Sequence, residues 1–223
     1  MRSSYDAIFA DEKGTQLYYE WIKSFLKKDD TILECACGTG DLFSLFATDY
    51  KGMAFDLDED KIADAQKKFP ELAEVFFVGD FLNIALDKKF DALYCVNDST
   101  NHIMHRDDLE KFVAETTKLS DLILLDSHHP YRLEEFAEPY LEEGHRGGID
   151  YAYQISVEND KLIHIINYLD GTFDTVYQWV FDPKVLIKCY EEKGFTVDVF
   201  TDFTEKGISK IGEKVMYVIR KDV

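Results

Sequence analysis

The chain has 223 residues, of which 46% are hydrophobic and 31% charged, a composition typical of a folded protein rather than a disordered one. This length fits one large α/β domain, or one domain with a modest insertion, better than two equal independent domains. Acidic residues outnumber basic ones by 44 to 25, and a net charge of −19 repels phosphate backbones and anionic membranes, so we expect neither a nucleic-acid nor a membrane partner.

The N-terminal residues lack the apolar run of a signal peptide, and no apolar stretch approaches the length of a membrane span, which predicts a cytoplasmic protein. The four cysteines lie in apolar runs and are too few for a disulfide framework, so we expect reduced thiols. Cys35 and Cys37 lack a second Cys or His pair at finger-like spacing, and His102 and His105 suit a surface pair at a helix start. We therefore expect no metal site.

The first half of the chain alternates short apolar runs with longer amphipathic stretches, the pattern of βαβ units. A leading helix is predicted over residues 16–27, where apolar side chains recur on one side. The predicted buried strands are residues 31–35, 52–55, 74–78, 92–96 and 122–125, and the covering helices include residues 59–69 and 106–119.

The second half changes character after Asp126. Alternating apolar and polar side chains predict a three-stranded antiparallel sheet over residues 151–157, 162–169 and 172–181. In the third strand the alternation predicts that Phe173 and Tyr177 lie on a covered face and Gln178 on a wet one. A helix over residues 183–192 and strands over residues 195–200 and 215–219 follow.

A glycine-bearing loop after the first strand is the main pointer to function. Gly38 and Gly40 precede a helix, the place where α/β sheets bind nucleotides. A dinucleotide fingerprint requires a small residue three positions after its second glycine, but Phe43 stands there, and Asp41 disfavours a pyrophosphate. S-adenosylmethionine (SAM) has no phosphate and carries a cationic ammonium, which suits Glu34. Taken alone, the loop is equally compatible with a strand-to-helix turn whose glycines serve geometry only.

Two further carboxylates follow at the ends of predicted strands. Asp56 ends the second strand, at the position from which NAD and SAM proteins hydrogen-bond ribose hydroxyls. Asp80 follows the third strand and suits an exocyclic adenine amine. A carboxylate that merely starts a loop is the simpler interpretation of Asp80 when it is taken alone.

In this order, the motifs LECACGTG, FDLD, GDF and FDALYC resemble those of class I SAM-dependent methyltransferases. They span residues 32–96, and their one departure is Ala36, where that family most often has glycine. The resemblance implies a SAM cofactor and these contacts: Glu34, Ala36, Gly38 and Gly40 with the methionine moiety, Asp56 and Leu57 with ribose and adenine, and Asp80 and Phe81 with adenine, while Tyr5 and Asn97 also border SAM. For Tyr5, and for its neighbours Tyr18 and Tyr19, a packing role is an equal alternative.

More narrowly, residues 97–102 and 126–131 and the antiparallel insertion resemble small bacterial YqeM-like methyltransferases. The resemblance implies an α/β fold, with a Rossmann-like seven-stranded mixed sheet flanked by helices and an antiparallel β insertion after the fifth strand. Residues 1–126 and 182–223 would form the SAM-binding methyltransferase core. Residues 127–181 would form an inserted subdomain that covers the active site.

Methyl transfer from a sulfonium is an in-line displacement, which needs alignment and exclusion of water more than acid-base catalysis. The candidate catalytic residues leave the fourth and fifth strands, and we expect them to include Asn97, Asp98 and His128. His128 is the best base by type because its ordinary pKa lies near neutrality. A histidine in a His-His-Pro turn is nevertheless more often a solvated loop residue.

The sequence thus predicts an enzyme, a SAM-dependent methyltransferase acting on a small molecule, as a monomer or a homodimer. One alternative is a non-catalytic SAM-binding regulatory module, since no side chain is decisive for chemistry. A second is a nucleotide-dependent oxidoreductase, which Phe43 and Asp41 disfavour. A protein acceptor also stays open.

Overall fold

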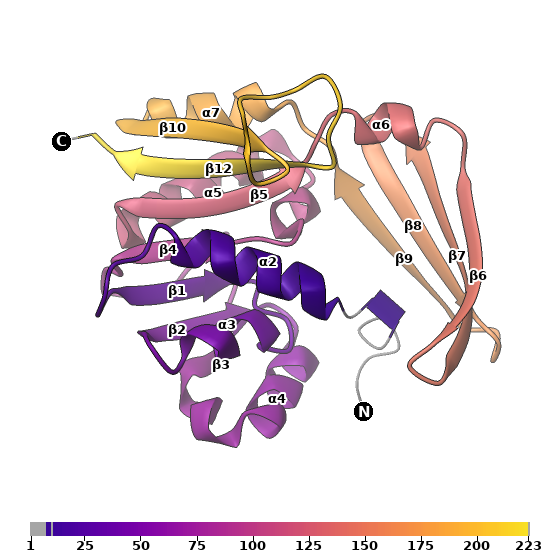
Figure 1. Ribbon diagram of the computed structural model, residues 1–223, viewed down its shortest axis with the longest axis horizontal. Helices are drawn as coiled ribbons and strands as arrows, with labels where there is room; N and C mark the ends of the chain where they lie inside the picture. The colour runs from indigo at the N-terminus through magenta and orange to yellow at the C-terminus, as the bar shows by residue number, and fades with distance from the viewer. Residues whose placement is uncertain (1–7, 10, 223) are drawn as a thin grey trace.

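A central eight-stranded sheet organises the protein (Figure 1) in a computed structural model that describes residues 8–9 and 11–222. Its strand order is β11-β10-β12-β5-β4-β1-β2-β3. The strands are β1 (Thr31–Cys35), β2 (Lys51–Asp56), β3 (Phe76–Val78), β4 (Ala92–Cys95), β5 (Leu122–His128), β10 (Phe195–Thr201), β11 (Glu205–Lys206) and β12 (Lys214–Lys221). The two-residue β11 extends the predicted seven strands by one at an edge.

Strands β1 to β5 are parallel to one another, whereas β12 pairs antiparallel with both β5 and β10. Every residue of β4 is buried, as expected for a central parallel strand covered on both faces. From β1 the chain moves outward to β2 and β3 and then returns to the other side of β1 as β4. The resulting switch point at the carboxyl ends of β1 and β4 is where open α/β sheets bind ligands.

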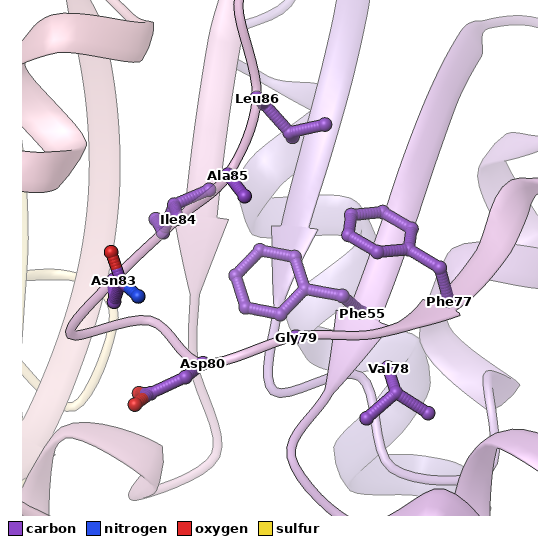
Figure 2. A pocket seen from close by; sticks show the side chains of 9 residues that line it. All are labelled: Phe55, Phe77, Val78, Gly79, Asp80, Asn83, Ile84, Ala85 and Leu86. Atoms are coloured by element: carbon purple, nitrogen blue, oxygen red, sulfur yellow. The ribbon is translucent and has the colours of Figure 1, made fainter.

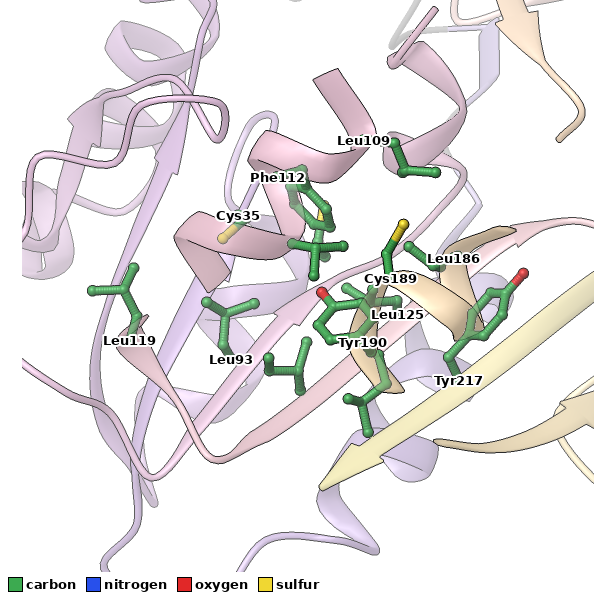
Figure 3. Packing of buried hydrophobic residues seen from close by; sticks show 14 of the residues in the cluster. Cys35, Leu93, Leu109, Phe112, Leu119, Leu125, Leu186, Cys189, Tyr190 and Tyr217 are labelled. Atoms are coloured by element: carbon green, nitrogen blue, oxygen red, sulfur yellow. The ribbon is translucent and has the colours of Figure 1, made fainter. Parts of the chain in front are cut away.

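Helices cover both faces of this sheet. Helices α2 (Glu12–Lys23), α3 (Asp41–Phe46) and α4 (Glu59–Lys68) bury their apolar sides in one cluster with residues of β1, β2 and β4. Helices α5 (Arg106–Leu119) and α7 (Pro183–Glu191) pack on the other face, where Figure 3 shows their leucine, phenylalanine and tyrosine side chains meeting those of the strands. The side chains of Asp11, Asp58 and Asp182 cap α2, α4 and α7 and so define where these helices begin.

A second, four-stranded antiparallel sheet comprises β6 (Tyr140–Arg146), β7 (Ile149–Glu158), β8 (Lys161–Tyr168) and β9 (Phe173–Trp179). Figure 1 shows it on the side of the core sheet toward which β5 points. The short helix α6 (Arg132–Glu135) follows β5, and the 3₁₀ turns η1 (Pro70–Val75) and η2 (Ser99–His102) lie in the core. The sequence predicted three of these four strands. It missed β6 because this edge strand has no buried residue and hence no clear hydrophobic alternation.

The predicted orientation of β9 is wrong. Phe173 and Tyr177 are 66% and 50% exposed, whereas Gln178 is only 7% exposed. Alternation separates the two faces of a strand, but it does not reveal which face the rest of the protein covers. The covered face of β9 is the one that carries Gln178. The side chain of Gln178 contacts a polar residue of the core sheet there.

Among residues 8–9 and 11–222, no helix is both long and apolar enough to cross a membrane. The second sheet lies within residues 140–179, inside the predicted insertion 127–181. The division into a core and an inserted subdomain that covers the active site stays a prediction.

Candidate functional site

The loop after β1 adopts a left-handed backbone at three positions. The φ angles of Ala36, Gly38 and Gly40 are 58°, 55° and 77°. A Cβ atom at Gly40 would lie 2.6 Å from Phe76 Cζ, so this position requires glycine for packing as well as for conformation. A Cβ atom at Gly38 would meet no atom of the described residues within 4 Å. The loop therefore leaves open space above Gly38, where a ligand could approach the backbone.

Glu34 lies at the end of β1 with only 4% of its surface exposed. The hydroxyl of Tyr94 on the neighbouring strand donates to Glu34 Oε2 at 3.1 Å. Burial raises the pKa of Glu34 to about 8, and the Tyr94 hydrogen bond offsets this only in part. The carboxyl group is therefore mostly protonated at neutral pH, and a nearby cation would draw it into the charged form.

Asp56 connects the glycine loop to the end of β2. Its Oδ2 accepts a hydrogen bond from Gly38 N–H at 2.8 Å, and its Oδ1 accepts one from Asp58 N–H at 3.0 Å. Leu57, beside it, is largely exposed. A carboxylate fixed by backbone donors next to an exposed apolar side chain offers both an acceptor and a flat apolar contact to a ligand.

Residues 79–91, between β3 and β4, form a loop without a helix. Under it lies a hollow of about 360 Å³, lined by Phe55, Phe77, Val78, Gly79, Asp80, Asn83, Ile84, Ala85 and Leu86. Figure 2 shows the rings of Phe55 and Phe77 side by side, with their centroids 5.4 Å apart, and Asp80 and Asn83 to one side. Asp80 Oδ1 accepts from Leu82 N–H at 2.8 Å. The ring of Phe81 turns away and packs on Phe112 of α5.

The residues that leave β4 are held by a buried group of charges. Asn97 and Asp98 have φ angles of 63° and 62°, and the N–H of Asp98 donates to Asp126 Oδ1 at 3.1 Å. Lys214 Nζ lies 2.7 Å from Asp98 Oδ1 and 3.5 Å from Asp126 Oδ2. The hydroxyl of Tyr18 on α2 also donates to Asp126. Three elements, α2, β5 and β12, thus fix the exit of β4, and Asn97 remains exposed there.

The ionisation of this group follows from burial and from Lys214. Burial opposes the charged form of Asp98, but the Lys214 ammonium and His128 outweigh it and lower the pKa of Asp98 to about 2. For Asp126, burial outweighs Lys214 and raises the pKa. Asp98 is therefore ionised near neutral pH, and it is the more acidic of the two carboxyl groups.

His128 is the last residue of β5 and only 5% exposed, so it is not a solvated loop residue. Its Nδ1 lies 3.4 Å from Asp98 Oδ1, and its Nε2 lies 2.8 Å from Gln178 Oε1. Its backbone N–H donates to Asn101 Oδ1 at 2.9 Å, and Asn101 Nδ2 donates to the carbonyl of Trp179 at 2.6 Å. The predicted residues Asp98 and His128 therefore lie next to each other, and Gln178 on β9 of the second sheet contacts His128.

Four residues of this region were not predicted from the sequence to belong to the site: Lys214, Gln178, Asp126 and His164. His164 on β8 is buried, and its Nδ1 lies 2.6 Å from the hydroxyl of Tyr153. Only the pairing of Lys214 with His128 in the β12 and β5 register brings that lysine to the site. The local sequence contains no signal for such a contact.

The other predicted positions have simpler outcomes. Tyr5 lies outside the described residues. Tyr19 packs on Phe46, with ring centroids 4.7 Å apart, and His102 and His105 are exposed. Within the described part of the chain, no three His, Cys, Asp or Glu side chains gather in a way that could hold a metal ion.

The comparisons with known proteins agree with this geometry. The family described as "Methyltransferase domain" matches residues 32–120. The "Putative methyltransferase YqeM" of Bacillus subtilis (strain 168) is 25% identical over 235 residues, which cover 98% of this chain and 95% of that protein. The predicted resemblance to SAM-dependent methyltransferases is therefore confirmed.

Solved structures confirm the predicted fold class. An S-adenosylmethionine-dependent methyltransferase from Clostridium acetobutylicum ATCC 824 has a TM-score of 0.84 at 20% identity, over 98% of this chain and 96% of that one. SAM-bound CalS10, an amino pentose methyltransferase from Micromonospora echinaspora, has a TM-score of 0.74 at 15% identity, over 93% and 90% of the two chains. The predicted enzyme class and the predicted cofactor agree with these findings.

Proposed function

We propose that the protein transfers the methyl group of SAM to a small-molecule acceptor, at the edge of the core sheet where β1, β2, β4 and β5 end. The observation that carries the proposal is the hydrogen bond from Gly38 N–H to Asp56 Oδ2, 2.8 Å long. It joins the glycine loop to the carboxylate expected to bind ribose, beside the open space above Gly38. Such an arrangement suits the ribose of a nucleoside, and Asp41 in the first turn of α3 disfavours a pyrophosphate beside it.

When bound, SAM supplies an electrophilic methyl carbon on its sulfonium. The chain offers suitable partners for the ammonium, the ribose and the adenine of that molecule. Glu34 would attract the ammonium, and Asp56 would accept from the ribose hydroxyls. The aromatic walls of the hollow beside Asp80 suit a flat adenine ring, and the Asp80 carboxylate would accept from the exocyclic amine. Leu57, exposed in this structure, would be covered by the ligand.

Asn97, Asp98 and His128 are proposed to serve the acceptor. Asp98 and His128 lie 3.4 Å apart and are both largely buried, which favours strong electrostatic interactions between them. His128 would take the proton that the acceptor loses, and the Asp98 carboxylate would stabilise the imidazolium that forms. The exposed amide of Asn97 at the exit of β4 would orient the acceptor or the amino-acid part of SAM.

A small acceptor is favoured because the second sheet already occupies the side of the site next to His128, through Gln178 and through the bond of Asn101 to Trp179. We propose that residues 127–181 form a subdomain that covers the site. The name of the similar amino pentose methyltransferase supports an acceptor of modest size. The cytoplasmic location, the lack of a nucleic-acid partner and a monomeric or homodimeric state rest on the sequence alone.

Titration calorimetry tests the donor half of this proposal. We expect SAM and S-adenosylhomocysteine (SAH) to bind with micromolar affinity and NAD not to bind. Absence of SAM and SAH binding at high micromolar concentrations, or tighter binding of NAD, would refute the proposal. Incubation of the enzyme with methyl-labelled SAM and a pool of metabolites tests the transfer, because a regulatory module would label nothing.

A further inference from the structure

Strand β9 forms one edge of the second sheet, and β6 forms the other (Figure 1). The N–H of Val180 donates to the Asp160 carbonyl, and the N–H of Tyr168 donates to the Thr172 carbonyl, which fixes how β9 bonds to β8. Because hydrogen-bonded and non-hydrogen-bonded positions alternate in an antiparallel pair, every second residue of β9 points its N–H and carbonyl away from β8. These residues are Phe173, Thr175, Tyr177 and Trp179.

Part of this edge has no partner. The carbonyl of Trp179 accepts from Asn101 Nδ2 at 2.6 Å, so the core closes the edge at that end. Among the residues that the structure describes, none bonds to the outward backbone groups of Phe173, Thr175 or Tyr177. All three side chains are exposed. A row of unpaired N–H and carbonyl groups on an exposed strand is a template for pairing with another chain.

The two edges of the second sheet differ in how they are protected from such pairing. The β6 edge carries the charged residues Glu142, Glu143 and Arg146, which oppose the approach of another strand. The only charged residue of β9 is Asp174. Its side chain lies on the same face as Gln178, where the hydroxyl of Tyr168 donates to it at 2.6 Å. The outer face of β9 therefore offers a strand edge without charge.

We propose that the β9 edge is a dimer interface, in which β9 of one copy pairs antiparallel with β9 of a second copy about a two-fold axis at Thr175. In this register Thr175 faces its own counterpart, and Phe173 faces Tyr177 of the partner subunit. The arrangement is self-complementary, as a two-fold interface requires. Threonine pairs and aromatic pairs across strands both stabilise a sheet. The two second sheets join into one continuous sheet.

Charge favours a second copy at this edge and selects its register. A net charge of −19 makes two copies repel over most of their surface, so they can meet most closely where charges are absent. With the axis at Thr175, Asp174 faces Val176 of the partner subunit. An axis at Asp174 would place two carboxylates opposite each other, which is destabilising. An axis at Val176 would require the carbonyl of Trp179, which already accepts from the core.

Sedimentation velocity at micromolar concentration tests the interface. We expect the wild-type protein to sediment as a dimer, and a monomer would overturn the proposal. Thr175→Lys places two ammonium groups opposite each other without removing a bond to β8, so the dimer dissociation constant should rise at least about tenfold. Leu141→Lys is the matched control, because Leu141 is exposed on the same face of β6 and should leave the dimer intact. Equal dimer stability in the two variants would also overturn the proposal.

Crosslinking tests the register directly. The four native cysteines are buried, so a short bis-maleimide should react mainly with a cysteine introduced on the surface. Thr175→Cys should yield a covalent dimer, whereas Leu141→Cys should not. Absence of the covalent dimer in Thr175→Cys would refute the pairing, even if Thr175→Lys failed to fold. Calorimetry with SAH on the same samples shows that each variant is folded, and it tests the methyltransferase function separately from the dimer.

Discussion

Lys214 Nζ lies 2.7 Å from Asp98 Oδ1, although the two residues come from distant parts of the chain. Lys214 begins β12, and Asp98 follows β4 on the far side of β5. The same ammonium is 3.5 Å from Asp126 Oδ2, so one lysine partners two buried carboxyl groups. The shape of the β4 exit, and with it the position of His128, depends on a charge that the last strand supplies.

Replacing Lys214 should destabilise the protein strongly. Lys214→Met leaves Asp98 buried without its cation, and breaking a buried pair typically costs about 3–5 kcal/mol. Lys221→Met is the control, since Lys221 forms an exposed pair with Asp121 at 3.6 Å, which is worth at most about 1 kcal/mol. Denaturant unfolding measures both values. Equal, small losses in the two variants would show that the buried pair does not stabilise the fold.

Binding of SAH should release a proton from Glu34. Burial raises the pKa of Glu34 to about 8, so its carboxyl group is mostly protonated at pH 7 in the free protein. The ligand's ammonium favours the carboxylate, and about one proton should leave on binding. Calorimetry at pH 7 in buffers with different ionisation enthalpies measures that number. It should fall toward zero at pH 9 and in Glu34→Gln, and a release that persists in Glu34→Gln would assign it to another group.

The same shift links the free energy of unfolding to pH. A carboxyl group whose pKa is raised on folding contributes its full stability below the unfolded value of 4.5 and loses it as pH rises through about 8. Each pH unit in this window lowers the free energy of unfolding by about 1.4 kcal/mol. Unfolding curves of the free protein should therefore show a loss between pH 5 and 8 that Glu34→Gln lacks. The effect of Asp98 falls in a separate pH range. Its pKa is lowered to about 2, so the stability that it contributes is lost only below about pH 4.

Asp56 should be required for ligand affinity. Its carboxylate is held by the N–H groups of Gly38 and Asp58, and a charged hydrogen bond to ribose contributes about 1.5–3 kcal/mol, or about 10- to 150-fold in the dissociation constant of SAH. Asp56→Asn should weaken binding by that factor in calorimetry. Asp58→Asn keeps the cap of α4 and should bind SAH normally. An unchanged affinity in Asp56→Asn would remove this residue from the site.

The donor half of the candidate site was predictable because its signals are local. Gly38, Gly40 and Asp56 stand at the ends of strands whose buried apolar runs mark them clearly, and parallel strands bring their carboxyl ends together. The outer face of β9 and the edge strand β6 were not predictable in this way. Alternation defines two faces, and only the tertiary contacts of Gln178 decide which one is covered.

The acceptor half was predictable only as a list of residue types. Asp98 and His128 were expected from their positions after β4 and β5, but the sequence favoured a solvated histidine. The partners that bury and orient them, Lys214 and Gln178, are a strand-end lysine and a strand glutamine without any motif. Their roles arise from antiparallel pairing of β12 with β5 and from the contact between the two sheets, which depend on long-range packing.

The two glycines of the loop should respond differently to alanine. Both have positive φ angles, where alanine costs about 1–2 kcal/mol. At Gly40 the new methyl group would also collide with Phe76, so Gly40→Ala should lose clearly more stability in denaturant unfolding. At Gly38 the methyl group would meet no atom within 4 Å in the part of the chain that the structure describes, and it would occupy the space proposed for the methionine part of SAM. Gly38→Ala should therefore lose only the stability that the strained backbone conformation costs. Its affinity for SAH should fall at least about tenfold. Wild-type affinity in a folded Gly38→Ala protein would show that the ligand does not lie above this loop.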